Sequence, residues 1–119
     1  MGFAASRIFV GEIDGILTVA MAERQDGSGQ SVVLQRAPQL DEQDLRLGID
    51  TYSVSTQTGA TAYDAISGWS VADHQIVLQF DRESARSLGT ARQTRIDVPP
   101  RELAAVTELI GRITRLEPG

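Results

Sequence analysis

Runs of alternating apolar and polar residues, broken by short turn-forming pairs, occupy most of the chain before residue 98. The first two runs, "SRIFVGEI" (residues 6–13) and "GILTVAMAE" (residues 15–23), are rich in β-branched and aromatic residues. Asp14-Gly15 separates them, and this pair is a strong signal for a two-residue hairpin turn. The opening of the chain therefore predicts two antiparallel strands joined by a tight turn.

Five further segments alternate in the same way and predict additional strands. They are residues 31–36, 49–56, 66–72, 75–80 and 94–98, with a turn and strand entrance at 57–64. Asp73-His74 joins the third and fourth of them in a second hairpin. Ile76, Leu78 and Phe80 are expected to face the core. Val32 and Leu34 are expected to share one face of their strand, as are Tyr52, Val54 and Thr56.

A single long amphipathic helix is expected at the end of the sequence. Pro99-Pro100 ends the last strand, and Pro100 suits the first turn of a helix running from about residue 100 to 116. Its apolar stripe consists of Leu103, Val106, Ile110 and Ile113, joined by Leu109 and Leu116. The pattern predicts an α+β fold: a mainly antiparallel sheet of about five to seven strands, with this helix packed on one face.

One or two short helical segments are also expected. "LQRAPQLDEQDLRLG" and "LQFDRESARSLGT" both read as a strand, a capping Asp, a short helix and a Leu-Gly stop. In the first copy Asp41 is the cap and Gly48 the stop. The shared order suggests a weak internal duplication.

The composition indicates one domain spanning residues 1–119. With 41% hydrophobic residues and no Cys, the chain can bury a core without disulfides. The start of the sequence lacks the pattern of a signal peptide, and no run is long enough to span a membrane. We therefore expect a cytoplasmic protein without a membrane partner.

The formal net charge of −5 limits the partners that the chain can bind. Nucleic-acid binding depends on clustered basic residues that neutralise phosphates, so a nucleic-acid partner is not expected. An acidic protein instead attracts basic partners and raises their rate of association. The charge thus favours a positively charged protein partner.

Residue patterns for catalysis or cofactor binding are not found. His74 is the single His and lies in an expected turn. Adjacent residues point in different directions, so Asp73 is not expected to hold His74 as a general base. No Ser has the Gly-x-Ser-x-Gly context of a nucleophile elbow. A metal would need an all-oxygen site, and residues 41–44 lack the spacing of a calcium loop. We expect no catalytic residues, no cofactor and no bound metal.

Surface recognition remains as the expected role. The segment from residue 41 to 50 contains four acidic residues and one basic residue, Arg46. The acidic residues are Asp41, Glu42, Asp44 and Asp50. We assign partner binding to Glu42, Asp44 and Asp50, with Tyr52 added if its ring is exposed, and to Trp69. Helix capping is an alternative role for Asp44, and core packing is the alternative for Trp69.

The run "LQRAPQLDEQDLRLGIDTYSV" resembles the immunity protein 10 family of bacterial polymorphic toxin systems. The matching pieces are Leu34-Gln35-Arg36, the acidic residues 41–44, Leu47-Gly48 and Asp50-Thr51-Tyr52, and a later "FDRESARSLG" is similar in placement. The resemblance implies an α+β protein that binds and neutralises a cognate toxin without catalysis. It departs from the family at "TGATAYDAISG", where Ala occupies positions expected to be Gly.

Two other functional classes stay open at this point. The first is a small hydrolase or isomerase with a carboxylate site around Asp44 and Asp50. The second is a structural or regulatory subunit that forms a homo-oligomer through a sheet edge. A deep polar pocket that gathers Asp44, Asp50 and an Arg would favour the enzyme.

Overall fold

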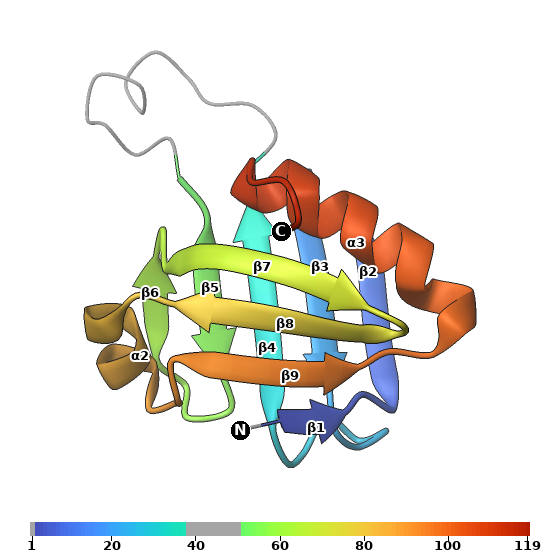
Figure 1. The fold of residues 1–119 in the computed structure, drawn as a ribbon, viewed down its shortest axis with the longest axis horizontal. Coiled ribbons are helices and arrows are strands. Elements are labelled where there is room, and N and C mark those ends of the chain that lie inside the picture. The colour runs from blue at the N-terminus through green and yellow to red at the C-terminus, as the bar shows by residue number, and fades with distance from the viewer. Residues whose placement is uncertain (1, 38–50) are drawn as a thin grey trace.

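Two β-sheets and two helices make up the part of the chain that the computed structural model describes, residues 2–37 and 51–119 (Figure 1). The five-stranded sheet has the order β2 (Arg7–Ile13), β3 (Ile16–Ala22), β4 (Ser31–Arg36), β5 (Ser53–Thr56) and β6 (Thr61–Tyr63). The four-stranded sheet has the order β1 (Gly2–Ala4), β9 (Gln93–Asp97), β8 (Gln75–Phe80) and β7 (Ile66–Ala72). The helices are α2 (Arg82–Leu88) and α3 (Pro100–Thr114).

The expected α+β class is confirmed, and β2 to β6 form an antiparallel sheet of the expected size with α3 packed on it, but the second, four-stranded sheet was not expected. The described residues form nine strands in two sheets. Every paired strand is antiparallel except β1, which lies parallel to β9. Alternation in the sequence identifies strands but does not say which sheet each one joins. The three residues of β1 are too few to carry a detectable alternation.

Both predicted hairpins are present. At the β2–β3 turn, Asp14 has φ 51° and Gly15 has φ 80°, which are the positive values that this kind of two-residue turn needs. At the β7–β8 turn, Asp73 has φ 56°, and an Asp tolerates this left-handed conformation better than most residues. The His74 carbonyl accepts a hydrogen bond from the Val98 N–H at 2.9 Å, so the backbone of this turn is tied to the chain after β9.

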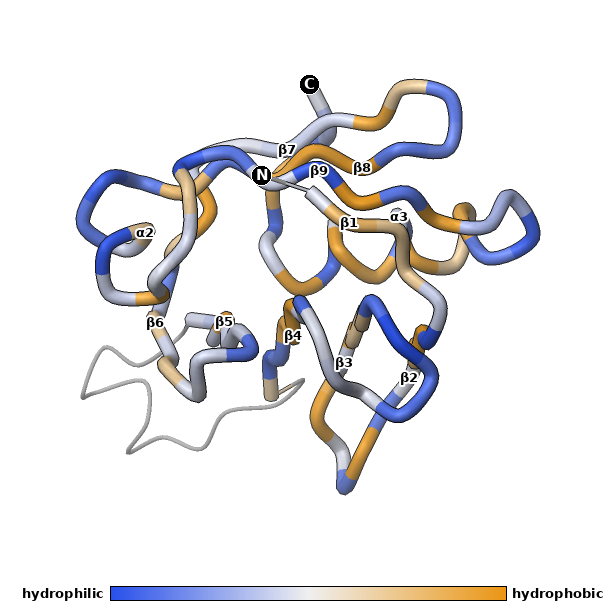
Figure 2. Tube along the Cα trace, turned by 90° about the horizontal axis from the view of Figure 1, so that it is seen from below, coloured by the Kyte–Doolittle hydropathy of each residue, from blue (hydrophilic) through white to orange (hydrophobic). Residues whose placement is uncertain are grey.

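The four-stranded sheet lies across the inner face of the five-stranded sheet, and α3 packs on β2, β3 and β4 (Figure 1). Figure 2 shows the two layers from below, with β1 and β7 to β9 in one layer and β2 to β6 in the other. Residues from all three elements form one hydrophobic core, among them Val19, Met21, Leu34, Val54, Ile76, Leu78, Phe80, Ile96, Ile110 and Ile113. The inner face of the five-stranded sheet is thus covered by two elements rather than by the helix alone.

The apolar stripe of α3 is confirmed, with one exception. Val106, Leu109, Ile110 and Ile113 are buried, and Leu103 is half-buried. Leu116 is exposed, because the helix ends at Thr114 and Arg115 turns left-handed with φ 60°.

The second copy of the strand-cap-helix device is also confirmed. The Asp81 carboxylate accepts a hydrogen bond from the Ser84 N–H at 2.8 Å, and α2 ends at Gly89 with φ 67°. The first copy, with Asp41 and Gly48, lies outside the described residues, so the internal duplication stays a prediction.

A buried cluster of Arg36 and Tyr52 joins the three main elements. The Tyr52 hydroxyl accepts a hydrogen bond from the Ile66 N–H at 2.9 Å and lies 3.3 Å from the Ile66 carbonyl oxygen, to which it donates. The Arg36 guanidinium lies 5.6 Å from the centre of the Tyr52 ring, and its Nε–H donates to the Ile113 carbonyl at 2.5 Å. Burial raises the pKa of the Tyr52 hydroxyl above its usual value, so this group stays neutral.

Replacing Tyr52 with Phe should lower the free energy of unfolding by about 1 to 3 kcal/mol, because the buried N–H and C=O of Ile66 lose a partner. Urea denaturation of the two proteins measures the difference. Tyr63→Phe is the matched control, since Tyr63 is 68% exposed and its substitution should change stability by less than about 0.5 kcal/mol. Equal denaturation midpoints for Tyr52→Phe and Tyr63→Phe would contradict this role.

The Asp81 cap predicts a specific pH dependence. Hydrogen bonds from Ser84 hold the pKa of Asp81 below its usual value of 3.8. Because the pKa of Asp81 is lower in the folded chain than in the unfolded chain, the ionised carboxylate stabilises the fold. This stabilisation is fully present at a pH above the pKa of the unfolded chain and is lost as the pH falls through the pKa of the folded chain. Asp81→Ala should therefore lower the melting temperature at about pH 7, with a smaller difference at about pH 3. Thermal denaturation at both pH values is the measurement, and a constant difference would argue against the cap.

Candidate partner-binding surface

The outer face of the five-stranded sheet is not covered by any other described element. The strand register places its side chains in cross-strand rows, since alternate residues of each strand share a face. One row is Phe9, Ala20, Val33, Ser55 and Thr61, and the next is Gly11, Thr18, Gln35, Ser53 and Tyr63. Ile13 and Ile16 pair beyond these rows, where β2 and β3 approach their turn.

Exposed apolar side chains concentrate on this face. Five large hydrophobic side chains of the described residues are exposed. Four of them lie here, namely Phe9 at 42%, Ile13 at 45%, Ile16 at 37% and Tyr63 at 68%. Such grouping is typical of a surface that another protein covers, because scattered exposure would need no explanation.

A shallow hollow of about 410 Å³ lies on this face over β2, β3 and β4. Phe9, Ile13 and Val33 form apolar walls, and the small side chains of Ala20 and Ala22 form part of its lining between them. The hollow therefore has room for an apolar side chain of a partner.

Two carboxylates stand at the hairpin end of β2 and β3: Asp14 lies in the turn, and Glu12 lies on the inner-face side of β2, where it pairs with Leu17. Glu12 and Asp14 are exposed, and neither has a hydrogen-bond or ion-pair partner among the described residues. Arg7, at the other end of β2, donates a hydrogen bond to the Gln25 carbonyl at 3.3 Å. The hairpin end thus combines exposed apolar side chains with negative charge that has no partner in residues 2–37 and 51–119.

The residues to which the sequence assigned partner binding do not lie on this surface as far as the structure describes them. Glu42, Asp44 and Asp50 fall outside the described residues. The Tyr52 side chain is only 2% exposed, so the condition for adding it to the surface is not met. Trp69 is 4% exposed, and its indole N–H donates to the Leu116 carbonyl at 2.9 Å, which agrees with the packing alternative.

Phe9, Ile13 and Ile16 are not among the partner-binding residues predicted from the sequence, although the sequence carries a signal for them. In "RIFVGEI" the apolar residues Ile8, Phe9 and Val10 are consecutive, so both faces of this strand carry apolar side chains. A strand with one buried and one wet face would alternate instead.

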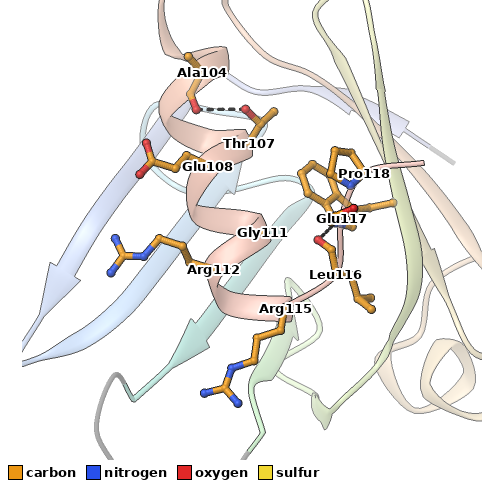
Figure 3. Close-up of a pocket in the computed structure, with 10 residues that line it drawn as sticks. Ala104, Thr107, Glu108, Gly111, Arg112, Arg115, Leu116, Glu117 and Pro118 are labelled. Carbon is orange, nitrogen blue, oxygen red and sulfur yellow. Dashed lines mark hydrogen bonds between the residues drawn. The ribbon is translucent and has the colours of Figure 1, made fainter.

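A second hollow of about 510 Å³ lies between α3 and the segment that follows it (Figure 3). Glu108 and Arg112 project from one side of the helix, while Gly111 leaves a gap on the side that faces Leu116 to Pro118. The polar groups at its rim do not converge on a common point in Figure 3. The hollow is an open depression beside α3, and Gly111 adds no side chain to its wall.

The described residues offer little for catalysis or metal binding. Among them no group of three or more His, Asp or Glu side chains could hold a metal ion. His74 is exposed in the β7–β8 turn. The pKa values of Asp26 and Asp81 are lowered by hydrogen bonds from Ser28 and Ser84, as expected for a turn and a helix cap. These shifts have local structural causes and do not mark an active site.

Comparison with known families decides the assignment. The family model of immunity protein 10 matches residues 4–104, which include β2 to β9 completely and the first turn of α3. The chain belongs to the immunity protein 10 family. No curated protein and no solved structure matches it. The resemblance seen in the sequence is confirmed, and the matched region contains all of the outer sheet face.

Membership places the protein among immunity proteins, which neutralise toxins and are generally not catalytic. None of the helices in residues 2–37 and 51–119 has the length and apolar character needed to cross a membrane.

Gly111→Ala should raise the free energy of unfolding by about 0.4 to 1 kcal/mol, because it removes backbone freedom from the unfolded chain. The added Cβ would meet Trp69 Cζ2 and the Leu116 carbonyl oxygen at 3.9 Å, an ordinary contact distance. Gly89→Ala is the matched control and should destabilise, since Gly89 has φ 67° and its Cβ would lie 3.2 Å from Thr58 Cγ2. Chemical denaturation of both variants gives the comparison, and a destabilised Gly111→Ala would show that the hollow is not free space.

Proposed function

We propose that this immunity protein 10 family member neutralises a cognate protein toxin by binding it, without chemical modification of the toxin. The observation that carries the proposal is the exposed outer face of the five-stranded sheet, which gathers Phe9, Ile13, Ile16 and Tyr63. Aromatic and apolar side chains on a flat, rigid support are typical of protein interfaces. Family membership supplies the kind of partner, a toxin.

The charge of the chain supports a basic toxin. With a formal net charge of −5, the protein attracts a positively charged partner at a distance and speeds the encounter. Toxins that act on nucleic acids need positive surface to hold phosphates, so they are one class that such an inhibitor would suit. Covering that positive surface would by itself block access of the substrate.

The enzyme alternative is less well supported. It requires a polar pocket around Asp44 and Asp50, and these residues lie outside the described part of the chain. The hollow on the outer sheet face is lined mainly by apolar and small side chains, with Arg7 as its charged group. A hollow of this kind suits the covering of apolar groups better than acid-base chemistry.

Co-expression with the toxin encoded by a neighbouring gene tests the proposal. Cells that produce both proteins should survive, and the two purified proteins should form a complex of fixed stoichiometry in which the toxin keeps its mass. Cell death in the presence of the immunity protein, or a toxin that is released with altered covalent structure, would contradict neutralisation by binding.

Glu42, Asp44 and Asp50 remain part of the proposal as residues that steer the toxin. Replacing Glu42 and Asp50 with Lys should slow association about tenfold at low ionic strength, weaken its salt dependence and leave thermal stability nearly unchanged. Association rates at two salt concentrations give the result. The matched control is Glu108→Lys with Glu117→Lys, which changes the net charge equally at exposed positions on α3 and after it. If both double variants slowed association equally, Glu42 and Asp50 would act only through the net charge of the protein.

A further inference from the structure

β2 is a long open edge of the five-stranded sheet. Its seven residues pair with β3 on one side, and none of the described residues pairs with its other side. In an antiparallel ladder, alternate residues of an edge strand direct their backbone N–H and C=O groups away from the sheet. β2 therefore presents a row of backbone groups that another extended segment can pair with.

The other edges are shorter or contacted. β6 and β1 have three residues each, and α2 packs against β6. At β7, the Trp69 carbonyl accepts a hydrogen bond from the Gly119 N–H at 2.7 Å. β2 is longer than β1 and β6, and it differs from β7, which has the same length, in receiving no such backbone hydrogen bond from the described residues.

β2 has few of the features that keep edge strands from pairing. Natural edge strands are commonly blocked by Lys, by Pro or by charges that point inward. β2 contains neither Lys nor Pro, and its charged residues, Arg7 and Glu12, lie near its two ends. Glu12 is on the same face of the strand as Ile8 and Val10, but it is exposed at the hairpin end. Its middle is the apolar run from Ile8 to Val10.

The open edge coincides with the exposed apolar side chains. Phe9 and Ile13 belong to β2, and Ile16 is paired with Ile13 across the hairpin. A strand added beside β2 would place alternate side chains next to Phe9 and Ile13 on the outer face. Backbone pairing and apolar burial would thus act together at one place.

The charge at this edge indicates the kind of segment that fits. Glu12 and Asp14 are exposed and have no partner among the described residues, so the hairpin end is negative. We infer that the toxin binds by adding an extended segment, apolar with a basic residue near the hairpin end, to β2 as a sixth strand of the sheet. The inference rests on the proposed function. A second copy of this chain fits less well, because it would bring another net charge of −5.

Hydrogen–deuterium exchange tests strand addition directly. The probe is the purified, catalytically inactivated toxin domain encoded by the neighbouring gene. In the complex, amides of residues 7–13 should exchange at least about tenfold more slowly than in the free protein, since outward N–H groups gain partners. Toxin binding that leaves exchange in residues 7–13 unchanged would overturn the inference.

Side-chain variants provide a second test. Phe9→Ser with Ile13→Ser should weaken toxin binding at least about tenfold, and Glu12→Lys should slow association. Leu116→Ser is the matched control, because Leu116 is an exposed apolar residue that follows α3 and does not belong to the outer face of the five-stranded sheet. It should change affinity less than about twofold. Circular dichroism checks that each variant folds, and a stronger effect of Leu116→Ser than of the double variant would place the toxin elsewhere.

The outcomes separate the inference from the proposed function. If the unaltered protein neither binds the toxin nor protects cells, the proposed function fails and the inference fails with it. If it binds and protects but residues 7–13 exchange as before, only the inference fails. Sedimentation of the free protein completes the test. If the free protein is a dimer and residues 7–13 exchange slowly in it, β2 pairs with a second copy of this chain, and the inference that it pairs with the toxin is overturned.

Discussion

The hydrogen bonds of the Tyr52 hydroxyl with the backbone of Ile66 connect the two sheets of this protein. Tyr52 lies next to β5 in the five-stranded sheet, and Ile66 begins β7 in the four-stranded sheet. Arg36, at the end of β4, lies over the same ring and donates to the last turn of α3. Because these polar groups are buried, breaking one contact leaves another group without a partner, which fixes the three elements relative to one another.

Because the inner face of the five-stranded sheet is covered, its outer face is the one available to a partner. The four-stranded sheet and α3 together cover the inner side chains of β2 to β6, including Val19, Leu34 and Val54. The outer side chains of the same strands have no such cover among the described elements. The apolar residues there, led by Phe9 and Ile13, cannot be explained by core packing. A sheet with one face packed in the core and exposed apolar side chains on the other is suited to recognition, which agrees with an immunity protein.

The candidate surface was less predictable from the sequence than the strands that form it. The sequence favoured Tyr52 and Trp69 because aromatic residues are common at interfaces, yet both side chains are buried in the structure. Their burial depends on which sheet lies opposite each ring, and that is a long-range property. The sequence does not single out Phe9, because an apolar residue in a strand is more simply assigned to the core. Only the register with Ala20 shows that it belongs to the outer row.

The sequence by itself determined the local structure: the Asp14-Gly15 hairpin turn, the inward rows of Val32 with Leu34 and of Ile76 with Leu78, the Asp81 cap and the stripe of α3. Each of these depends on residues within a few positions of one another, through backbone conformation or the periodicity of burial. Tertiary structure decided the division into two sheets, the parallel addition of β1 to β9, the end of α3 at Thr114 and the open edge at β2. These features arise from pairing and packing between distant segments, for which a period of two or 3.6 residues carries no information.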